Sequence, residues 1–567
     1  MKFGHPKGLW YMFGTEMWER FGYYLMLGIF SLYMIDGWNN GGMGFSDGTK
    51  SDIYGTYLGL VYLTPFIGGL IADRLLGYRR SIIIGGLMMA CGYFFLSVHS
   101  TTTFYLALLL IILGNGFFKP NISTLVGSLY SEDSLKDKKD AGFNIFYMGI
   151  NIGAFICNFV AAYMRINYGW GAAFAAAGVG MLVGVVIFIL GNKHIKSYDV
   201  VKPLQDGDMS TGKILGLTVL PMFLFGTLGY MLPGNFLGSD TNDAFIIGCL
   251  PVIGFFIYLA FKSEAKESRA IKALLAVFTC VILFFAIFHQ NGDALTIWAE
   301  DHTDREMSAG VAGVADKVGM AQLVVNNELV SSDNKTFKDS IAKLEKIAET
   351  MPSSTKAELD ARASYNSNIE LQKKSRMYFS NLPKEKIPQK GKDLKLYSTE
   401  LYQSINPFWV VLLTPIMVGV WGFFRRRKRE PSTPTKIFIG LIITALSALV
   451  MVGAVFATND MTGKASSLWL LASYGVITIG ELCLSPMGLS LVSKLSPPRI
   501  TALMMGGFFL AISVGNKLSG MLSSLWETTE QKENFFYLNF ALVMAAAIIL
   551  FAMLRWLNRV MKENNVL

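Results

Sequence analysis

The stretch Glu16–Tyr24, with the sequence EMWERFGYY, lies inside an otherwise apolar run that extends from Leu9 to Ile35. The run is long enough to cross a bilayer as a helix. In a helix, Glu16, Glu19, Arg20 and Tyr23 share one face, so two carboxylates, a guanidinium and a phenol project together. Each charge at the bilayer centre costs about 2.5–3.5 kcal/mol on insertion scales. This face is therefore expected to line a wet, protein-walled interior.

The charged face has two interpretations. The simpler one is an ion pair that only joins helices, although two carboxylates of like sign make a poor contact for that purpose. We favour a transport or proton-binding site, because ionisable groups inside membrane segments usually mark ion or substrate pathways.

The composition is that of a protein that crosses the membrane many times. The chain has 567 residues, 52% of them hydrophobic, and a mean hydropathy of +0.42, unlike a soluble domain. The net charge of +9 comes largely from short loops, so it reports topology and gives no reason to expect a nucleic-acid partner. The five cysteines have no paired spacing and the five histidines no metal-ligand spacing, so we expect free thiols, no metal and no cofactor. The first apolar run is of spanning length and charged, so we expect no cleavable signal peptide.

Run lengths predict about fourteen membrane-spanning helices. After Leu9–Ile35 the candidates are Ile53–Leu76, Ser81–Val98, Phe104–Tyr130, Phe143–Tyr163, Trp170–Leu190, Ile214–Leu232, Ala244–Phe261, Ile271–Gln290, Pro407–Phe424, Lys436–Phe456, Leu468–Val492, Thr501–Leu525 and Phe535–Leu557. Basic residues concentrate in alternate loops, whereas Pro233–Asp243 has no lysine or arginine. The positive-inside rule then predicts a multi-pass protein of the cytoplasmic membrane with both termini in the cytoplasm.

The segment from Asp301 to Gln403 breaks the pattern, because it is polar and contains no spanning run. It must be extracytoplasmic for the charge pattern elsewhere to hold, and long loops translocate regardless of charge. The helical periodicity of Phe337–Ala348 favours a small helical domain or lid. The alternative is a flexible linker, because Tyr378–Phe379 is too small an aromatic pair to predict a core.

The loop after the second predicted span has the sequence GLIADRLLGYRR. Its small residues allow helix ends to approach closely, and its charged residues can form a network at the cytoplasmic surface. The loop resembles the loop motif of the major facilitator superfamily, whose fold is two six-helix bundles that rock about a central site. The residues that carry the resemblance are Gly69, Asp73, Arg74, Gly77, Arg79 and Arg80.

We therefore expect an all-α polytopic membrane protein with the major facilitator fold, in five parts. These are a six-helix bundle at residues 1–195, two extra helices at 196–269, the first helix of the second bundle at 270–300, a helical extracytoplasmic insertion at 301–403, and the remainder of the second bundle at 404–567.

Five further motifs resemble, in order, those of the proton-coupled oligopeptide transporters. They are the first-helix signature in Glu16–Tyr24, FKPN at Phe118–Asn121, FYMGINIG at Phe146–Gly153, Asn406-Pro407, and GELCLSPMG at Gly480–Gly488. The likeness runs along essentially the whole membrane part, and two extra helices are typical of prokaryotic members. The resemblance implies no enzyme but a symporter that imports di- and tripeptides with protons by alternating access. Its expected partners are small peptides, protons and the lipid bilayer, and we expect a monomer.

The predicted cavity offers matching poles to a zwitterionic peptide. Arg20 and Lys119 can bind the carboxylate, and Glu481 can bind the ammonium group. A lysine within a membrane segment needs an acidic partner or a ligand carboxylate unless it reaches the interface, and Glu481 could instead be a capping or gating carboxylate. The family resemblance assigns similar binding positions to Tyr23, Tyr24, Tyr62, Tyr147, Asn151, Gln290, Asn406, Ser485 and Phe508.

A charge count suggests why a proton is needed. With all groups ionised, Glu16, Glu19 and Glu481 exceed Arg20 and Lys119 by one negative charge. An occluded cavity disfavours that net charge, so one carboxylate should be protonated when a neutral zwitterion is bound. Inward movement of that proton is electrogenic and makes about 2.3 kcal/mol available per 100 mV.

The sequence departs from the family pattern at three positions. Leu27 replaces a frequent arginine and His289 a frequent acidic residue, and in relatives these two form an external gate pair. Phe508 replaces a usual tryptophan, which bears on side-chain selectivity. We include His289 in the proton-coupling set as a histidine that titrates near pH 6.5 when unperturbed. The alternative is a structural histidine that hydrogen-bonds a helix carbonyl.

Other classes of function explain the sequence less well. A membrane enzyme would need a catalytic constellation, and the chain has no nucleophile elbow or metal-ligand spacing. A ligand-sensing receptor could use the same cavity but would not require a proton-titrating trio. A proton-coupled symporter of another small anionic or zwitterionic solute remains the alternative within transporters.

Overall fold

The computed structural model describes residues 5–130, 135, 138–199, 210–326, 342, 346, 378–379, 381–389, 391–458, 461–497 and 500–564. Within these residues, twelve helical segments are long and apolar enough to cross a membrane. Two more long helices complete the predicted set of fourteen: α1, which carries the charged stretch, and α8, whose apolar part is Leu215–Met231. The prediction of an all-α polytopic membrane protein is confirmed.

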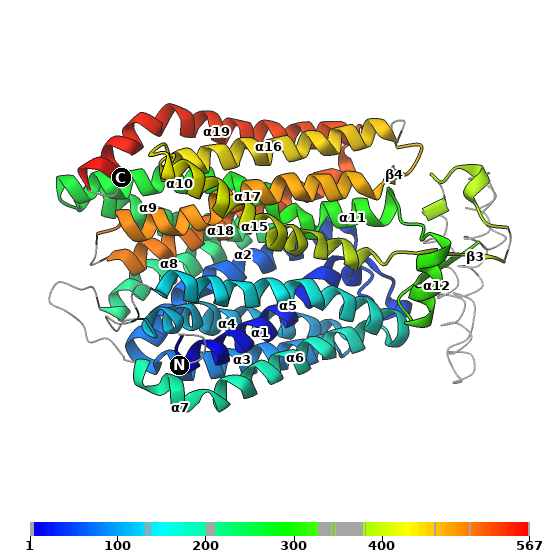
Figure 1. The fold of residues 1–567 in the computed structure, drawn as a ribbon, viewed down its shortest axis with the longest axis horizontal. Helices are drawn as coiled ribbons and strands as arrows, with labels where there is room; N and C mark the ends of the chain where they lie inside the picture. Colours follow the sequence, from blue (N-terminus) through cyan, green and yellow to red (C-terminus); the bar gives the residue numbers. More distant parts are fainter. Residues whose placement is uncertain are drawn as a thin grey trace.

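The helices form two bundles that lie side by side (Figure 1). The first contains α1 (Lys7–Ile35), α2 (Asp47–Ile71), α3 (Tyr78–Leu96), α4 (Thr101–Ser128), α5 (Lys139–Tyr168) and α6 (Trp170–Leu190), followed by the short α7 (Asn192–Ile195). The second contains α10 (Ala265–Phe288), α15 (Ile405–Arg426), α16 (Thr433–Ala457), α17 (Ser467–Leu495), α18 (Thr501–Thr528) and α19 (Lys532–Glu563). The bundles meet mainly where α2 packs on α18 and α5 packs on α15.

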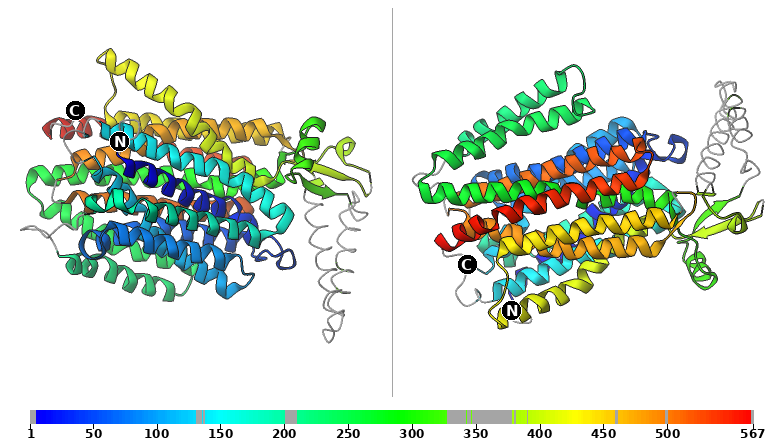
Figure 2. Two further views of the ribbon diagram at one scale, coloured as in Figure 1. Left: turned by 60° about the horizontal axis from the view of Figure 1, so that its bottom comes forward. Right: turned by 90° about the horizontal axis from the view of Figure 1, so that it is seen from above.

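Two helices stand outside the bundles. They are α8 (Thr211–Met231) and α9 (Asp240–Lys262), which pack against each other as a hairpin alongside α2, α10 and α18 (Figure 2). Both chain ends lie at one end of the molecule, here called the termini end, and the insertion lies at the other, here called the insertion end (Figure 1).

Polar caps extend several helices beyond the apolar runs that predicted them. Helix α2 begins at Asp47 rather than at Ile53, because the Ser46 side chain accepts a hydrogen bond from the Thr49 backbone N–H and satisfies a donor of the first turn. Beyond α2, a π-helical turn covers Ala72–Leu76, and Gly77 ends it with φ of 77°, a conformation that favours glycine.

Glycines bring two of the helix contacts close. A Cβ added to Gly153 in α5 would lie 2.2 Å from the Met17 carbonyl oxygen in α1, next to the charged stretch. Between the bundles, a Cβ at Gly520 in α18 would lie 2.5 Å from the Ser51 carbonyl oxygen in α2. Small residues at such crossings let backbones pack where side chains would separate them.

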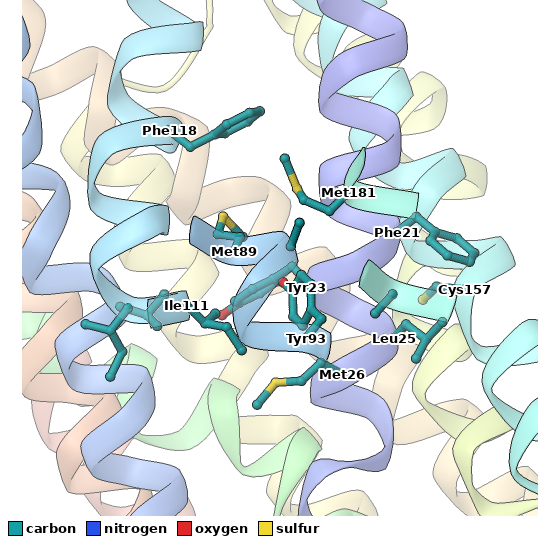
Figure 3. Packing of buried hydrophobic residues seen from close by; sticks show 14 of the residues in the cluster. Phe21, Tyr23, Leu25, Met26, Met89, Tyr93, Ile111, Phe118, Cys157 and Met181 are labelled. Atoms are coloured by element: carbon teal, nitrogen blue, oxygen red, sulfur yellow. The ribbon is translucent and has the colours of Figure 1, made fainter. Parts of the chain in front are cut away.

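A continuous apolar core fills the first bundle around α1. Figure 3 shows part of it, with Tyr23, Met26, Tyr93 and Met181 packed together. A second cluster fills the other bundle around α10 and α18. Each bundle therefore has its own core, and Leu63 of α2 belongs to the second one, so apolar packing also joins the bundles where α2 meets α18.

The described part of the insertion is not purely helical. It contains α12 (Ala309–Lys317) and an antiparallel pair of β2 (Gln322–Val325) with β3 (Asp393–Leu396), and it follows α11 (Ala294–Asp301), which continues the span begun by α10. Strand β1 (Thr303–Asp304) pairs with β4 (Ala465–Ser466) between α16 and α17. The helical prediction for Phe337–Ala348 falls largely outside the described residues. Tyr378 and Phe379, which seemed too few for a core, are buried with Leu396.

Two cations that pack on the Tyr378 ring, Lys464 and Arg305, connect this insertion to the second bundle. The Tyr378 ring lies 4.0 Å from Lys464 Nζ and 5.4 Å from the Arg305 guanidinium carbon, and Lys464 also donates to the Asp301 carbonyl at 2.5 Å. Burial, and then the neighbouring Arg305, lowers the pKa of Lys464 from 10.5 to about 7. Because the buried form holds fewer protons than an exposed lysine between pH 7 and 10.5, docking of the insertion strengthens as the pH rises through that range.

Candidate functional site

The charged stretch of α1 is buried, as its helical spacing predicted. Glu16 is 3%, Glu19 0% and Arg20 2% exposed. The Arg20 guanidinium donates to both oxygens of Glu19, with Nη2 to Oε1 at 2.6 Å, and its Nε lies 3.2 Å from Glu16 Oε1. The other Glu16 oxygen, Oε2, is buried without a hydrogen-bond partner in the described structure. One guanidinium therefore pairs with two carboxylates, and Oε2 of Glu16, which has no partner in the described structure, is a suitable position for a proton.

Lys119 faces aromatic groups rather than an acid. Its Nζ lies 4.0 Å from the centre of the Tyr62 ring in α2, and among the described residues no carboxylate lies within ion-pair distance of it. Lys119 precedes Pro120 within α4. An intramembrane ammonium that lies on a ring face and has no direct ion-pair partner in the described structure is available to an incoming anion.

A carboxylate on the second bundle provides the opposite pole. Glu481 Oε2 accepts a hydrogen bond of 3.2 Å from the Asn406 amide nitrogen, which also donates to Thr478 at 2.9 Å. Asn406 thus orients Glu481 across the contact between α15 and α17. Neither residue has a cationic partner among the described side chains.

A cavity of about 1330 Å³ lies between the two bundles. Its walls include the predicted residues Lys119, Tyr147 and Ser485, and Leu482 continues the wall beside Glu481. Tyr147 is 39% exposed. The cavity extends toward the termini end, where Lys213 in the first turn of α8 and Lys262 at the end of α9 belong to its lining.

Tyr23 and Tyr24 form one aromatic wall on α1. Their ring centres are 5.3 Å apart, and the Arg20 guanidinium carbon lies 5.1 Å from the Tyr23 ring. Tyr24 is partly exposed, whereas Tyr23 is only 2% exposed. Asn151, at 8% exposure, donates to the Tyr147 carbonyl at 2.9 Å.

Two predicted contact residues lie behind the cavity wall. Gln290 exchanges two hydrogen bonds with Asn539 of α19 and is 2% exposed. Phe508 packs on Phe278 and beside Gly488, and its neighbour Phe509 lines the cavity instead. In this conformation, Gln290 and Phe508 therefore pack behind the cavity wall and do not contribute to its surface.

His289 lies in an aromatic pocket. Its ring centre is 5.5 Å from Phe285, 5.2 Å from Phe288 and 5.8 Å from Tyr62, and its buried Nδ1 has no hydrogen-bond partner in the described structure. Through Tyr62 it is connected to Lys119. Leu27 packs into the core of the first bundle.

The loop motif at the termini end is partly described. The Tyr78 backbone N–H donates to Asp199 Oδ1 at 2.8 Å, and Arg79 lies 3.9 Å from Asp199 Oδ2. Gly77 supplies the turn, whereas Arg80 is exposed. The side chains of Asp73 and Arg74 lie outside the described structure.

Three ion pairs, which the sequence analysis missed, join elements at the insertion end. Lys50 Nζ in α2 lies 2.5 Å from Asp293 Oδ1, next to α11, with side chains 3% and 0% exposed. Lys517 in α18 lies 2.6 Å from Asp52 in α2. These two pairs join opposite bundles. The only signal in the sequence was an unpaired charge close to the end of a predicted span, and nothing along the chain shows which charge meets which.

The third pair joins the first bundle to the stem of the insertion, residues 398–404. Arg165 in α5 pairs with Glu400, which is 0% exposed, and donates to Ser398 Oγ at 2.9 Å. Asn158 in α5 donates to Ser404 Oγ at 3.1 Å.

The architecture and the site together define a class of protein. Two six-helix bundles with a cavity between them and buried charges beside it are the arrangement of a transporter with the major facilitator fold. A sequence model described as the POT family matches residues 79–316 and 395–539. The chain belongs to this family, as the motifs indicated.

Individual relatives agree over nearly the whole chain. A di-/tripeptide transporter of Lactococcus lactis subsp. lactis is 28% identical over 93% of this chain and 91% of its own. The uncharacterized transporter YclF of Bacillus subtilis is 29% identical over 97% and 94%. The crystal structure of peptide transporter POT in complex with sulfate superimposes with a TM-score of 0.73 and 27% identity, covering 99% of this chain and 96% of that one. The protein is a multi-pass membrane transporter.

Proposed function

We propose that this protein imports di- and tripeptides across the cytoplasmic membrane together with protons. The observation that supports the proposal is the presence of opposite charges on the two bundles beside one cavity. Lys119 lines the cavity from the first bundle, which also holds the buried Arg20, and Glu481 precedes the cavity-lining Leu482 on the second. A peptide that bridges the poles would tie its carboxylate to one bundle and its ammonium group to the other, and so would favour closure of the cavity around it.

The proton is needed to balance the charge of the closed cavity. Three carboxylates face two cations, so a neutral zwitterion leaves one negative charge in excess. Glu16 and Glu19 share Arg20, and a peptide carboxylate that also engages Arg20 competes with them. Protonation of one of these two acids removes both the excess charge and the competition. Peptide and proton then enter together, which is symport.

The orientation follows from the loops. The basic loops lie at the termini end, which we assign to the cytoplasm, and the insertion end then faces outward. With this assignment, the conformation is inward-facing: the cavity extends toward the cytoplasm, and the three ion pairs lie on the outer side. Each chain contains a complete cavity, so a monomer suffices for transport. Chemistry on the substrate is not required, and the protein acts as a carrier rather than an enzyme.

Reconstitution tests this proposal. Proteoliposomes that contain the purified protein should accumulate a labelled dipeptide when the outside is acid or the inside negative, and accumulation should vanish when a protonophore is added. Uptake that ignores both gradients would contradict the coupling. The alternative substrate, another small anionic or zwitterionic solute, is tested by competition: unlabelled di- and tripeptides should inhibit, whereas amino acids, nitrate and sugars should not.

A further inference from the structure

A buried threonine lies behind the negative pole of the cavity. Thr478 precedes Glu481 by three residues on α17, so the two side chains share one side of the helix. Glu481 is partly exposed, whereas Thr478 is 0% exposed. The Thr478 hydroxyl contacts Asn406 in the first turn of α15. Thr478 can therefore influence a bound peptide only through its neighbours, and the direction of each hydrogen bond decides how.

The hydrogen bonds of the Thr478 hydroxyl run in one direction. Its Oγ1 donates its single proton to the Tyr474 carbonyl at 2.7 Å, a common bond of threonines within helices. Only lone pairs remain for Asn406, so the amide turns its nitrogen toward Thr478 and donates to Oγ1 at 2.9 Å. The same nitrogen donates to Glu481 Oε2 at 3.2 Å. A backbone carbonyl, which can only accept, thus sets the orientation of the amide that holds the carboxylate.

The reverse orientation of the Asn406 amide would work against ammonium binding. An asparagine side chain that turns over exchanges its oxygen and its nitrogen. The amide oxygen would then face the lone pairs of Thr478 and the carboxylate of Glu481, and both hydrogen bonds would be lost. Thr478 disfavours this orientation, so Glu481 keeps the donor that holds it in position.

The packing of α15 on α17 keeps Asn406 within reach of Thr478. Three residues further along α15, Trp409 Nε1 donates to the Leu471 carbonyl at 2.9 Å. A Cβ added to Gly475 would lie 3.1 Å from the Trp409 ring, so this glycine lets the indole lie close against α17. Because the indole fixes the register of the two helices, the contribution left to Thr478 is the orientation of the Asn406 amide.

We propose that Thr478 is a positioning residue for the ammonium group of the peptide: it fixes the Asn406 amide, and the amide holds the Glu481 carboxylate in place. The inference rests on the proposed function, in which Glu481 binds that ammonium group. A ligand with an acetylated amine makes no ion pair with Glu481. Thr478 should therefore matter for free peptides and little for acetylated ones.

Exchange of a labelled alanylalanine tracer across proteoliposomes that contain the full chain tests this inference. The measured quantity is the concentration of unlabelled alanylalanine, or of its N-acetyl derivative, that halves the exchange rate. Thr478→Val keeps the shape of the side chain but removes the acceptor, and should raise this concentration for alanylalanine by about threefold to tenfold. Thr478→Ser keeps the hydroxyl and should stay within about twofold of the wild type. If Thr478→Val does not insert, Thr478→Ala carries the same expectation.

Two comparisons separate an effect through Asn406 from a loss of packing. The matched control is Thr444→Val in α16. Thr444 is also 0% exposed, and its hydroxyl lies against Gly480 without a hydrogen-bond partner in the described structure, so its removal should change the measured concentration by less than about twofold. In an Asn406→Ala background, Thr478→Val should add less than about twofold, because the residue through which it acts is already missing.

Each outcome decides the inference. A loss for alanylalanine in Thr478→Val that exceeds the loss for the acetylated ligand, and that is absent from Thr478→Ser and Thr444→Val, supports it. No loss in Thr478→Val, equal losses for both ligands, an equal loss in Thr444→Val, or a full additional loss in the Asn406→Ala background overturns it while the proposed function stands. A wild type that accepts both ligands equally well contradicts the ammonium pole itself and overturns both.

Discussion

The ion pair between Lys50 and Asp293 offers the sharpest test of how the external side closes. It joins α2 to the residue just before α11, its atoms are 2.5 Å apart, and both side chains are almost fully buried. In the outward-open state the two helices separate and water reaches both groups. Lys50→Met therefore leaves Asp293 as a lone buried charge in the inward-facing state but not in the outward-facing state. Asp293→Asn leaves Lys50 with only the partly exposed Asp47, whose Oδ1 lies 3.9 Å from Lys50 Nζ.

The size of the shift follows from that asymmetry. Breaking a buried pair by removing one partner costs about 3–5 kcal/mol, which changes a conformational equilibrium by about 10²- to 10⁴-fold. Lys50→Met or Asp293→Asn alone should therefore move the population toward the outward-open state. The double variant leaves no buried charge and should return most of the way to the wild-type distribution.

Distances between spin labels report this equilibrium directly. Labels at Thr102→Cys and Leu468→Cys occupy exposed positions at the insertion end of the two bundles, in a background where the exposed Cys91 is replaced by serine. Each single variant should populate a longer distance that the wild type lacks. Lys395→Met, which breaks an exposed pair of 2.6 Å with Asp316, is the matched control and should change nothing.

The reasoning fails if the single variants keep the wild-type distance distribution. It also fails if the double variant is displaced as far as the single ones, because the shift would then come from lost packing rather than from an orphaned charge.

Four further predictions concern the site and the insertion. Glu19→Gln or Lys119→Ala should abolish uphill peptide uptake, because each removes one partner of the buried charge set. Glu19→Gln should still exchange peptide downhill. Accumulation at wild-type rates in both variants would disprove our coupling site. Glu481→Ala should weaken binding of free peptides by about 2–5 kcal/mol but affect N-acetylated peptides much less, and equal losses would contradict the assigned orientation. Replacing Thr303–Tyr397 by a short linker should leave a protein that inserts into the membrane and transports peptide, since the stem and the buried charges remain. A deletion variant that inserts but does not transport would show that the segment takes part in the transport cycle. His289→Asn should remove a limb between about pH 5.5 and 7 from the pH profile of peptide exchange. The reason is that the ring meets water when the external side opens, so its protonation favours the outward-open state. Superimposable profiles of wild type and variant would make this histidine structural.

Much of the fold was predictable from the chain because bilayer physics is local. A run of apolar residues of the right length must become a helix, since its backbone polar groups have no other partners in lipid. A charged stretch such as Glu16–Arg20 inside such a run must face away from lipid. Local sequence information was therefore enough to predict the burial of these residues and the fourteen long helices, and to recognise the family motifs.

The limits of the helices and of the cavity wall needed the structure. Polar caps such as Ser46 lengthen helices beyond their apolar runs. The insertion was predicted as helical, yet its described part also pairs β2 with β3 and packs around Tyr378, because a small core can form from residues far apart in the chain. Phe508 shares α18 with the cavity residue Phe509, and only the rotation of that helix decides which side chain reaches the surface. Gln290 lies in the turn after α10, where its hydrogen bonds with Asn539 hold it in the second bundle.

What the sequence determined by itself was therefore which residues carry charge inside the membrane, and with that the class of protein. What only the tertiary structure decided was which charges meet. Lys50 with Asp293 and Arg165 with Glu400 are each separated by more than two hundred residues, and no periodicity links them. Pairing across bundles depends on how two separately packed cores dock, and that is a property of the folded surfaces rather than of any local stretch of the chain.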